Sequence, residues 1–486
     1  MKRPVRRLAF FVVVLFLLLV VNLNWLQVVR ADALRNNPSN TRVLLDEYQR
    51  QRGSIVVDGT PIAVSTETND RLKYLRTYPQ GPEYAAVTGA YSIVYGASGI
   101  ERSQNAILAG TDDRLAGSAL GDLFSGRDPK GGNVILTIDK AAQDAAYKAL
   151  TDAGVVGAVV AMNPKTGAVL ALTSTPSYDP NTLSSHDPTA IRAAAQSLAA
   201  QNPDPRDNQA ISENYPPGST FKVIVTAAAL TKGITPDTVL PAPDLYTLPG
   251  TQTTLSNYDS EKCSSTQQET LLRSFTISCN TTFAKLAVDQ LGESDLRAMA
   301  TKFGVTDKGF DIPLPVAPST LGPIIDKASL AQSAIGQRDV RFTVMQDAML
   351  SCVVANGGQL MKPYLVAETQ APDLSVLDKA SPQKMGDAAI SSSAAGDLKD
   401  MMISVVQNGT GTKAQIPGVK VAGKTGTAQV APGVPDHSWF TGFAPADNPK
   451  IAISVFVKNG GATGGALTAP IAAAVMKAYL TAGGGK

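Results

Sequence analysis

The sequence predicts a mixed α/β (α+β) fold, an antiparallel sheet flanked by helices, which follows a β-rich domain and one N-terminal transmembrane helix. Three observations support this prediction. Apolar, β-rich runs occur at residues 134–174 and again at 420–457, and the long segment between them is largely helical in pattern. Strands at both ends with helices between them indicate one sheet built from distant parts of the chain. A basic cluster and a long apolar run open the sequence.

Residues 8–29 form the expected membrane anchor. These 22 residues are interrupted by few polar side chains, and they are enough to span a bilayer core of roughly 30 Å. The basic residues Lys2, Arg3, Arg6 and Arg7 precede the span, so residues 1–7 are expected in the cytoplasm and residues 30–486 outside it. The alternative is a signal peptide cleaved at Ala31-Asp32-Ala33, but the span is long for such a segment.

Composition argues against two classes of function. The net charge is +2, and no basic stretch follows the N-terminal cluster, so nucleic-acid binding is not expected. Two histidines and three scattered cysteines give no zinc-type spacing, and no flavin or nucleotide motif is present. We expect no metal and no cofactor.

The part outside the membrane divides into two expected domains, residues 30–133 and 134–486. Residues 36–40 are polar and predict a linker, and the alternation that ends in Asp58-Gly59 predicts a hairpin. A turn-rich stretch, 111–132, marks the boundary. Beyond it we expect a strand at 134–138, a helix at 140–153, a hairpin of 155–162 with 168–174, strands at 420–430, 438–443 and 451–457, and a last helix at 470–481.

Ser219-Thr220-Phe221-Lys222 is the leading candidate for the reactive site. It follows a Pro-Pro-Gly loop and precedes a run that is apolar all round, which predicts a buried helix with Ser219 in its first turn. Lys222 at i+3 shares the face of Ser219. A serine hydroxyl needs a nearby base, and a lysine supplies one when burial lowers its pKa. The same pattern at Ser381-Pro382-Gln383-Lys384 lies in a polar stretch and is interpreted as non-catalytic.

Two further elements complete the pattern Ser-x-x-Lys, Ser-x-Asn, Lys-Thr-Gly of one class of serine acyltransferases. Ser278-Cys279-Asn280 is expected in a loop that enters a helix, with Ser278 as a proton relay and Asn280 as a substrate ligand. Two other Ser-x-Asn matches, at 103–105 and 212–214, are poorly placed in the chain.

Lys424-Thr425-Gly426-Thr427 lies in a β-rich segment whose edge is suited to binding an extended peptide. Thr425 and Thr427 are expected to hold the carboxylate of that peptide, with Lys424 adding positive charge, and Gly426 permits close approach. The identical tripeptide at 165–167 is interpreted as a β-turn. No Gly-x-Ser-x-Gly elbow accompanies His186 or His437, so both histidines are expected to be structural.

These motifs, in this order and behind a membrane anchor, resemble those of the class B penicillin-binding proteins, most of all the actinobacterial A type. Further likenesses cover nearly the whole chain: Arg52-Gly53-x-Ile55, Ser98-Gly99-Ile100-Glu101, the stretch 134–139, and Ala355-Asn356-Gly357-Gly358. Cys279 departs from the usual Ser-Asp-Asn at a position that varies in the family.

The resemblance implies a β-rich pedestal (dimerisation-type) domain over residues 30–133 and a penicillin-binding serine transpeptidase domain over 134–486. It implies a peptidoglycan D,D-transpeptidase in which Ser219 attacks the penultimate D-Ala of a stem peptide, Lys222 is the base and Ser278 the relay. The backbone N–H groups of Ser219 and Thr427 would form the oxyanion hole, and β-lactams would acylate Ser219. Glycan polymerisation would require a partner, such as a SEDS-type polymerase or another divisome or elongasome membrane protein.

Two rival interpretations stay open at this point. One is a D,D-carboxypeptidase or β-lactamase on the same fold, although the Glu-x-x-Leu-Asn element of class A β-lactamases is missing from the sequence. The other is a non-catalytic β-lactam sensor or scaffold.

The cysteines permit one disulfide outside the cytoplasm. Cys352 lies in an apolar run and is expected to be a buried free thiol. We predict a bond between Cys263, in a polar loop, and Cys279, which would tether that loop to the Ser278–Asn280 turn. Two separate reduced thiols are the alternative.

Overall fold

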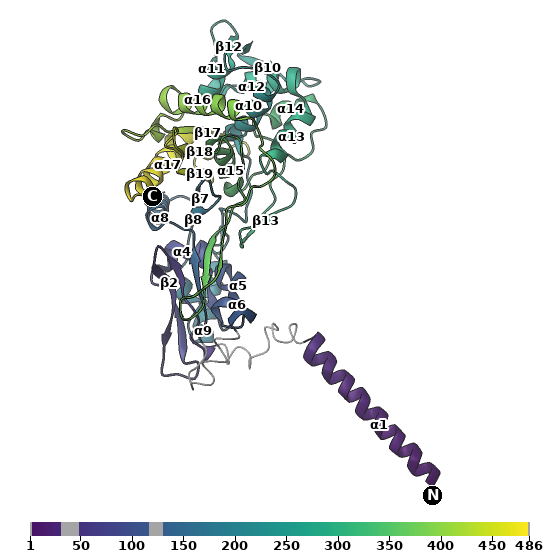
Figure 1. The fold of residues 1–486 in the computed structure, drawn as a ribbon. Helices are drawn as coiled ribbons and strands as arrows, with labels where there is room; N and C mark the ends of the chain where they lie inside the picture. Colours follow the sequence, from purple (N-terminus) through teal and green to yellow (C-terminus); the bar gives the residue numbers. More distant parts are fainter. Residues whose placement is uncertain (1, 31–47, 116–129, 485–486) are drawn as a thin grey trace.

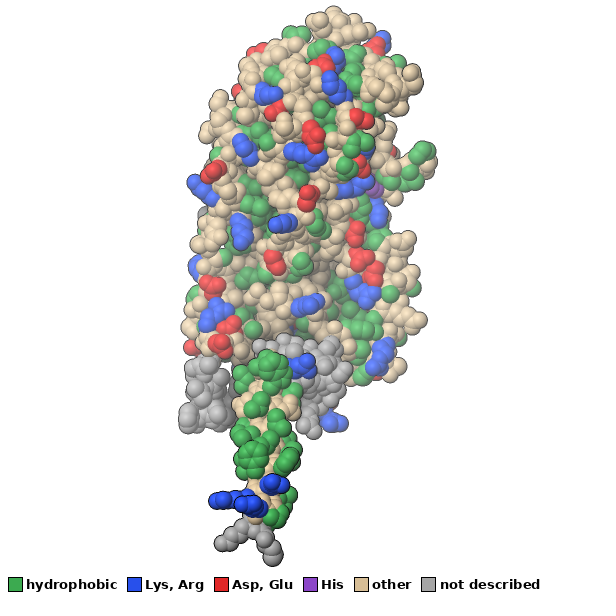
Figure 2. All heavy atoms as spheres, turned by 90° about the vertical axis from the view of Figure 1, so that its right-hand side faces the viewer, with side chains coloured by type: hydrophobic (Ala, Val, Ile, Leu, Met, Phe, Trp, Pro, Cys, Tyr) green, Lys and Arg blue, Asp and Glu red, His purple; other side chains and the backbone are tan. Residues whose placement is uncertain are grey.

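The computed structural model describes residues 2–30, 48–115 and 130–484 (Figure 1). The expected linker at 36–40 and the alternative cleavage site at 31–33 lie outside these residues. Helix α1 (Lys2–Asn24) continues into a π-helical turn, η1 (Trp25–Val29). Together they give one apolar helix, Arg3–Val29, of 27 residues, long enough to cross a membrane, and none of these residues is buried. Figure 2 shows apolar side chains along this helix and basic ones at its N-terminal end.

The first sheet has six strands in the order β16-β15-β6-β1-β2-β3. Their bounds are β1 (Ile55–Val57), β2 (Thr60–Glu67), β3 (Tyr74–Thr77), β6 (Asn133–Leu136), β15 (Val366–Gln370) and β16 (Val376–Lys379). The predicted hairpin is present between β1 and β2, where Asp58 and Gly59 both have positive φ. Strands β15 and β16 return from far along the chain to pair beside β6, so this sheet contains segments from both sides of the expected boundary at 133, which stays a prediction.

Short elements accompany this sheet: α4 (Gly81–Thr88), β4 (Tyr91–Ser92), β5 (Gly96–Ala97), α5 (Gly99–Ser103) and α6 (Asn105–Leu108). A buried ion cluster joins them to the strands. Arg52 Nε and Arg76 Nε each donate to the Glu101 carboxylate at 2.6 Å, and Glu101 is fully buried. Burial alone would raise the pKa of Glu101, but the guanidiniums of Arg76 and Arg52 lower it below its ordinary value. The cluster therefore joins α5 to β3 and to the segment that precedes β1 through buried charge pairs, which are costly to break.

The second sheet is antiparallel throughout, in the order β17-β18-β19-β7-β8. Its strands are β7 (Gly157–Met162), β8 (Val169–Thr175), β17 (Ala422–Ala428), β18 (His437–Ala444) and β19 (Ile451–Val457). The prediction of one antiparallel sheet assembled from distant segments is therefore confirmed. Strand β17 lies at the edge of the sheet.

Helices cover both faces of this sheet (Figure 1). Helices α8 (Lys140–Ala153) and α17 (Gly464–Thr481) pack together on one face, and α15 (Val344–Ala355) packs on the other. The bounds predicted for α8 are confirmed, because Asp139 caps its N-terminus and Gly154 ends it in the left-handed conformation. Helix α17 begins six residues before the predicted start, because Thr463 Oγ1 accepts the N–H of Ala466 and caps it there.

The middle of the chain is helical, as expected. Its helices are α9 (Pro188–Ala199), α10 (Lys222–Thr231), α11 (Leu271–Thr276), α12 (Asn280–Leu286), α13 (Glu293–Lys302), α14 (Lys327–Ser333) and α16 (Ser392–Asn408). Short strand pairs lie between them: β9 (Val239–Pro241) with β12 (Gln268–Thr270), β10 (Leu245–Thr247) with β11 (Thr254–Ser256), and β13 (Phe310–Asp311) with β14 (Pro315–Val316). Every residue of α10 from Lys222 to Ala229 is buried, so the predicted central helix is confirmed.

Candidate active site

The candidate nucleophile lies in a tight turn at the start of the central helix. The α-helix itself begins at Lys222, and Ser219 belongs to a preceding 3₁₀ turn, η4 (Gly218–Phe221), rather than to a first α-turn as expected. Residues i and i+3 are eclipsed in a 3₁₀ turn, so Ser219 and Lys222 still share one side. Gly218 has φ +56°, and a Cβ there would meet the Thr427 carbonyl oxygen at 2.5 Å. Glycine thus lets this turn pack directly against β17.

Lys222 is fully buried and is held by the second motif. Its Nζ donates to the Ser278 carbonyl at 2.7 Å and to Asn280 Oδ1 at 2.7 Å, and it lies 3.3 Å from Ser278 Oγ. Burial, and then the nearby charge of Lys424, lowers the pKa of Lys222 well below its ordinary value. A neutral amine at this position has the lone pair that a general base requires.

Ser278 stands between two lysines. Lys424 Nζ donates to Ser278 Oγ at 2.8 Å and to the Thr425 carbonyl at 3.0 Å. Burial lowers the pKa of Lys424 to about 7. Ser278 itself has φ +64°, a left-handed conformation that is unfavourable for a side chain and that is found at functional sites. The hydroxyl therefore lies within hydrogen-bonding distance of two lysine amines.

Strand β17 presents the third motif at the sheet edge. A Cβ on Gly426 would meet the Pro217 carbonyl oxygen at 2.7 Å. Gly426 was expected to let a ligand come close to the strand. In the structure it is the loop before Ser219 that comes close to Gly426. Thr425 Oγ1 shares a hydrogen bond with Thr410 Oγ1 at 2.5 Å. Lys424 and Thr425 are buried, whereas Thr427 is partly exposed, so the end of the motif nearest the turn of Ser219 is open to a ligand.

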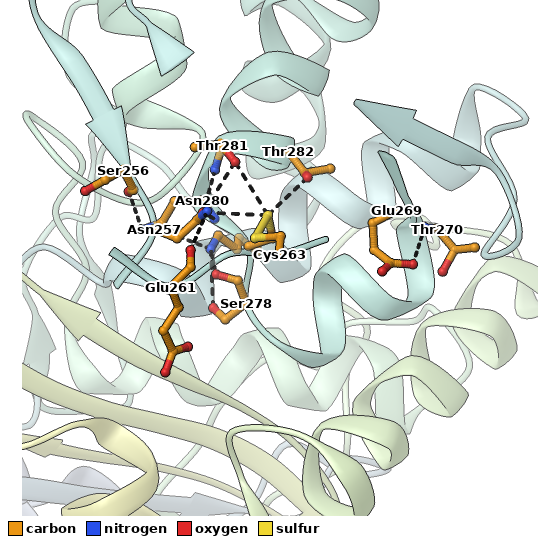
Figure 3. The surroundings of a disulfide bond; sticks show 12 residues. Ser256, Asn257, Glu261, Cys263, Glu269, Thr270, Ser278, Asn280, Thr281 and Thr282 are labelled. Atoms are coloured by element: carbon orange, nitrogen blue, oxygen red, sulfur yellow. Dashed lines mark hydrogen bonds between the residues drawn. A yellow bond between two sulfur atoms is a disulfide. The ribbon is translucent and has the colours of Figure 1, made fainter. Parts of the chain in front are cut away.

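The predicted disulfide is present in the structure (Figure 3). Cys263 and Cys279 are bonded, with their Cα atoms 5.9 Å apart, and Cys352 is a buried free cysteine. Beside the bond, Asn257 Oδ1 accepts the backbone N–H groups of Asn280 at 2.8 Å and Thr281 at 3.1 Å. This side chain satisfies the first N–H groups of α12, the helix on which Asn280 lies.

Three residues that support the site were missed from the sequence. Asn257 accepts the backbone N–H groups of Asn280 and Thr281, and Thr410 shares a hydrogen bond with Thr425 of the third motif. Asp347, on α15, is fully buried, and its carboxylate accepts from Ser454 Oγ at 2.7 Å. Burial raises the pKa of Asp347 to about 7, against the opposing effect of the Thr220 and Ser454 hydroxyls. None of the three belongs to a spaced pattern that could have identified it.

The other candidates lie elsewhere in the fold. His186 contacts Asp70 at 2.6 Å, and His437 Nδ1 accepts the N–H of Asn459. Residues 165–167 form the turn between β7 and β8, where Asn163 Oδ1 accepts the Lys165 N–H. Ser381 and Lys384 are exposed. The structure therefore brings together Ser219, Lys222, Ser278, Asn280 and the 424–427 strand, and leaves these alternatives outside.

Two protein-family models match successive parts of the chain. Residues 157–477 match the penicillin binding protein transpeptidase domain, and residues 52–134 match the penicillin binding protein A dimerisation domain. The chain is 45% identical to the peptidoglycan D,D-transpeptidase PbpA of Mycolicibacterium smegmatis, over 99% of this chain and all of that protein. It is 30% identical to the peptidoglycan D,D-transpeptidase MrdA of Acinetobacter baumannii, over 79% of this chain and 63% of that protein.

A solved structure agrees. Penicillin-binding protein A from M. tuberculosis, as its penicillin G acyl-enzyme complex, superposes with a TM-score of 0.85 and 44% identity, covering 89% of this chain and all of that one. The resemblance inferred from the ordered motifs is confirmed, and so is the fold. The chain belongs to the class B penicillin-binding proteins.

Proposed function

We propose that this protein is a membrane-anchored peptidoglycan D,D-transpeptidase that works through a Ser219 acyl-enzyme and that β-lactams inhibit covalently. The observation that carries the proposal is the meeting of two buried lysines at one serine hydroxyl, Ser278 Oγ, beside the turn of Ser219. That arrangement supplies a base and a proton relay without a histidine.

The proposed chemistry has two halves. Lys222 takes the proton of Ser219 as Oγ bonds to the penultimate D-Ala carbonyl, and the N–H groups of Ser219 and Thr427 stabilise the oxyanion. The bond to the terminal D-Ala breaks, and Ser278 passes the proton to the leaving amine. An amine of a second stem peptide then attacks the ester, gives its proton back through the same groups, and restores the Ser219 hydroxyl. Asn280 orients the peptide, while Thr425, Thr427 and Lys424 hold its terminal carboxylate.

Placement in the cell follows from the same proposal. Residues 8–29 of the apolar helix are the anchor, residues 1–7 are cytoplasmic, the pedestal over 30–133 raises the catalytic domain over 134–486 above the membrane, and both domains lie outside the cytoplasm. The membrane partner is a SEDS-type glycan polymerase or another divisome or elongasome protein, since the stem peptides to be joined lie on newly made glycan.

Mass spectrometry after incubation with penicillin tests the proposal. One adduct is expected on the full chain, on the peptide that contains Ser219, and it should persist for much longer than a β-lactamase intermediate. Ser219→Ala should abolish the adduct and leave the melting temperature nearly unchanged, and Ser381→Ala should change neither. An adduct on another serine, or rapid release of penicilloate, would contradict the assignment.

A further inference from the structure

A cavity of about 520 Å³ opens beside the nucleophile turn and has no role in the chemistry above. Polar donors that line it include Asn214, Gln337, Arg338, Arg341 and Gln429. Among the described residues that line it, none is acidic. A cavity of this size with convergent cationic donors is suited to a small anionic group.

The cavity is bounded by the elements that build the active site. The loop that carries Arg338 is tied to the nucleophile turn, because the Gly218 N–H donates to the Gly336 carbonyl at 2.9 Å. On another wall is Leu255 of β11, next to Ser256, whose carbonyl accepts from Asn280 Nδ2 at 3.4 Å. Gln429 and Val430 continue β17 directly beyond the third motif. The cavity thus lies beyond the end of the third motif, where the part of a bound peptide that extends past the reactive site would lie.

The two arginines are held differently, Arg341 by the backbone of this loop and Arg338 by one ion pair. Arg341 Nη1 donates to the carbonyls of Arg338 at 2.6 Å and Val340 at 2.9 Å, which leaves its remaining N–H groups for a ligand. Arg338 has φ +62°, a conformation that an arginine adopts at a cost. Its Nε lies 3.3 Å from Asp339 Oδ2, and both side chains are partly exposed, so this pair holds it only weakly.

His437 lines the same cavity as the two arginines. Its Nδ1 accepts the Asn459 N–H at 3.0 Å, so Nε2 carries the proton of the neutral ring. Burial, followed by the charges of Lys458 and Arg341, lowers the pKa of His437 to about 4. The imidazole is therefore a neutral donor at pH 7, in surroundings that already disfavour another positive charge.

The register of a bound peptide points to the part of the substrate that would enter. If the scissile carbonyl lies at the Thr427 N–H and the terminal carboxylate at Thr425, the chain adds antiparallel to β17 and its earlier residues run toward Gln429 and Val430. At about 3.3 Å per residue, the stem residue that precedes D-Ala-D-Ala lies beside Gln429. Its side chain is then at the cavity that Gln429 and the two arginines line.

We infer that this cavity is a donor-peptide subsite in which Arg338 and Arg341 bind a free carboxylate on the side chain of the stem residue preceding D-Ala-D-Ala. The inference rests on the proposed transpeptidase function. It adds the charge of one stem-peptide side chain, which the function alone does not define. A charge-assisted hydrogen bond to a carboxylate favours such a substrate over its amide by about tenfold or more.

Two matched acyl donors test this with the full-length protein in detergent. Both are stem-peptide thioesters ending in D-Ala-D-thiolactate, with D-alanine as the acceptor amine, and they differ only in a side-chain carboxylate or carboxamide at that residue. Thiol release gives kcat/KM. The wild type should prefer the carboxylate by about tenfold or more, Arg338→Gln with Arg341→Gln should bring the ratio near one, and Arg338→Glu should favour the amide.

The controls separate this inference from the proposed function. Arg338→Gly keeps the left-handed backbone without strain and should weaken the preference while leaving the fold intact. Arg192→Gln, on the exposed face of α9, should retain the full preference. Acylation of Ser219 by benzylpenicillin should change less than about twofold in every variant. Equal use of both donors by the wild type, or a preference that survives in the double variant, overturns the subsite. Failure of the wild type to react with either donor or with penicillin would instead overturn the proposed function.

Discussion

Lys424 offers a direct test of the electrostatics of the site, through the substitution Lys424→Met. The side chain is fully buried, and its pKa is lowered from 10.5 to about 7. Between these two values the unfolded chain holds a proton on Lys424 that the folded protein does not hold. Stability therefore rises with pH in this window, because the unfolded state binds more protons.

The magnitude follows from the two pKa values. One titrating group gives at most about 1.4 kcal/mol per pH unit. With a folded pKa of about 7, the contribution of Lys424 to the free energy of unfolding should increase by about 2 kcal/mol from pH 7 to pH 9. Lys424→Met removes this term, whereas buried groups that do not neighbour Lys424 titrate alike in both proteins. The difference in unfolding free energy, wild type minus variant, should rise by that amount.

Guanidinium unfolding at pH 7, 8 and 9 measures the difference. The fluorescence of Trp439, which is fully buried on β18 next to the third motif, is a suitable probe. A difference that stays constant across the three pH values would mean that Lys424 keeps its proton in the folded protein. The reasoning that burial governs its charge would then be wrong.

The remaining predictions concern the base and the disulfide. Lys222→Ala should lower the rate of acylation by penicillin by several orders of magnitude, measured by stopped-flow, while Lys384→Ala should not change it; a loss below about tenfold would exclude Lys222 as the base. Lys424→Met should move the acid limb of the acylation–pH profile upward, since the charge that lowers the pKa of Lys222 is removed; an unmoved limb would contradict the coupling. Replacing Cys263 and Cys279 by serine should cost about 3 kcal/mol in guanidinium unfolding, because a 16-residue loop is no longer closed; equal stability, or native thiols that alkylate without reduction, would contradict the bond.

Local patterns were enough to predict the elements that carry the three motifs. The apolar run after Lys222 predicted a buried helix because no face of it can meet water. The helix predicted at 140–153 has these bounds in the structure because Asp139 caps its start and Gly154 ends it, and capping chemistry is local. The antiparallel sheet followed from strands of similar character at both ends of the domain, and the Cys263–Cys279 bond followed from the polarity around each cysteine.

These local patterns could not predict which strands pair, or which residues make contact, across long separations in the sequence. Strand β6 joins β1 and β15 in the first sheet, and nothing in its own residues distinguishes this partner from the strands of the second sheet. Thr410 and Asn257 are single polar residues in loops, and each becomes informative only when the fold places it against Thr425 or α12. The 3₁₀ turn at Ser219 likewise depends on the packing of Gly218 on Thr427, a contact across 209 positions of sequence.

The geometry also gives two chemically identical side chains different tasks. Lys222 and Lys424 approach the same hydroxyl, at 3.3 and 2.8 Å, and two full positive charges this close in a buried site repel strongly. Burial lowers the pKa of both lysines, to about 7 for Lys424, and the charge of Lys424 acts in the same direction on Lys222. This asymmetry fits the proposed roles of Lys222 as the base and of Lys424 as the partner of the substrate carboxylate, with Ser278 as the hydroxyl that connects them.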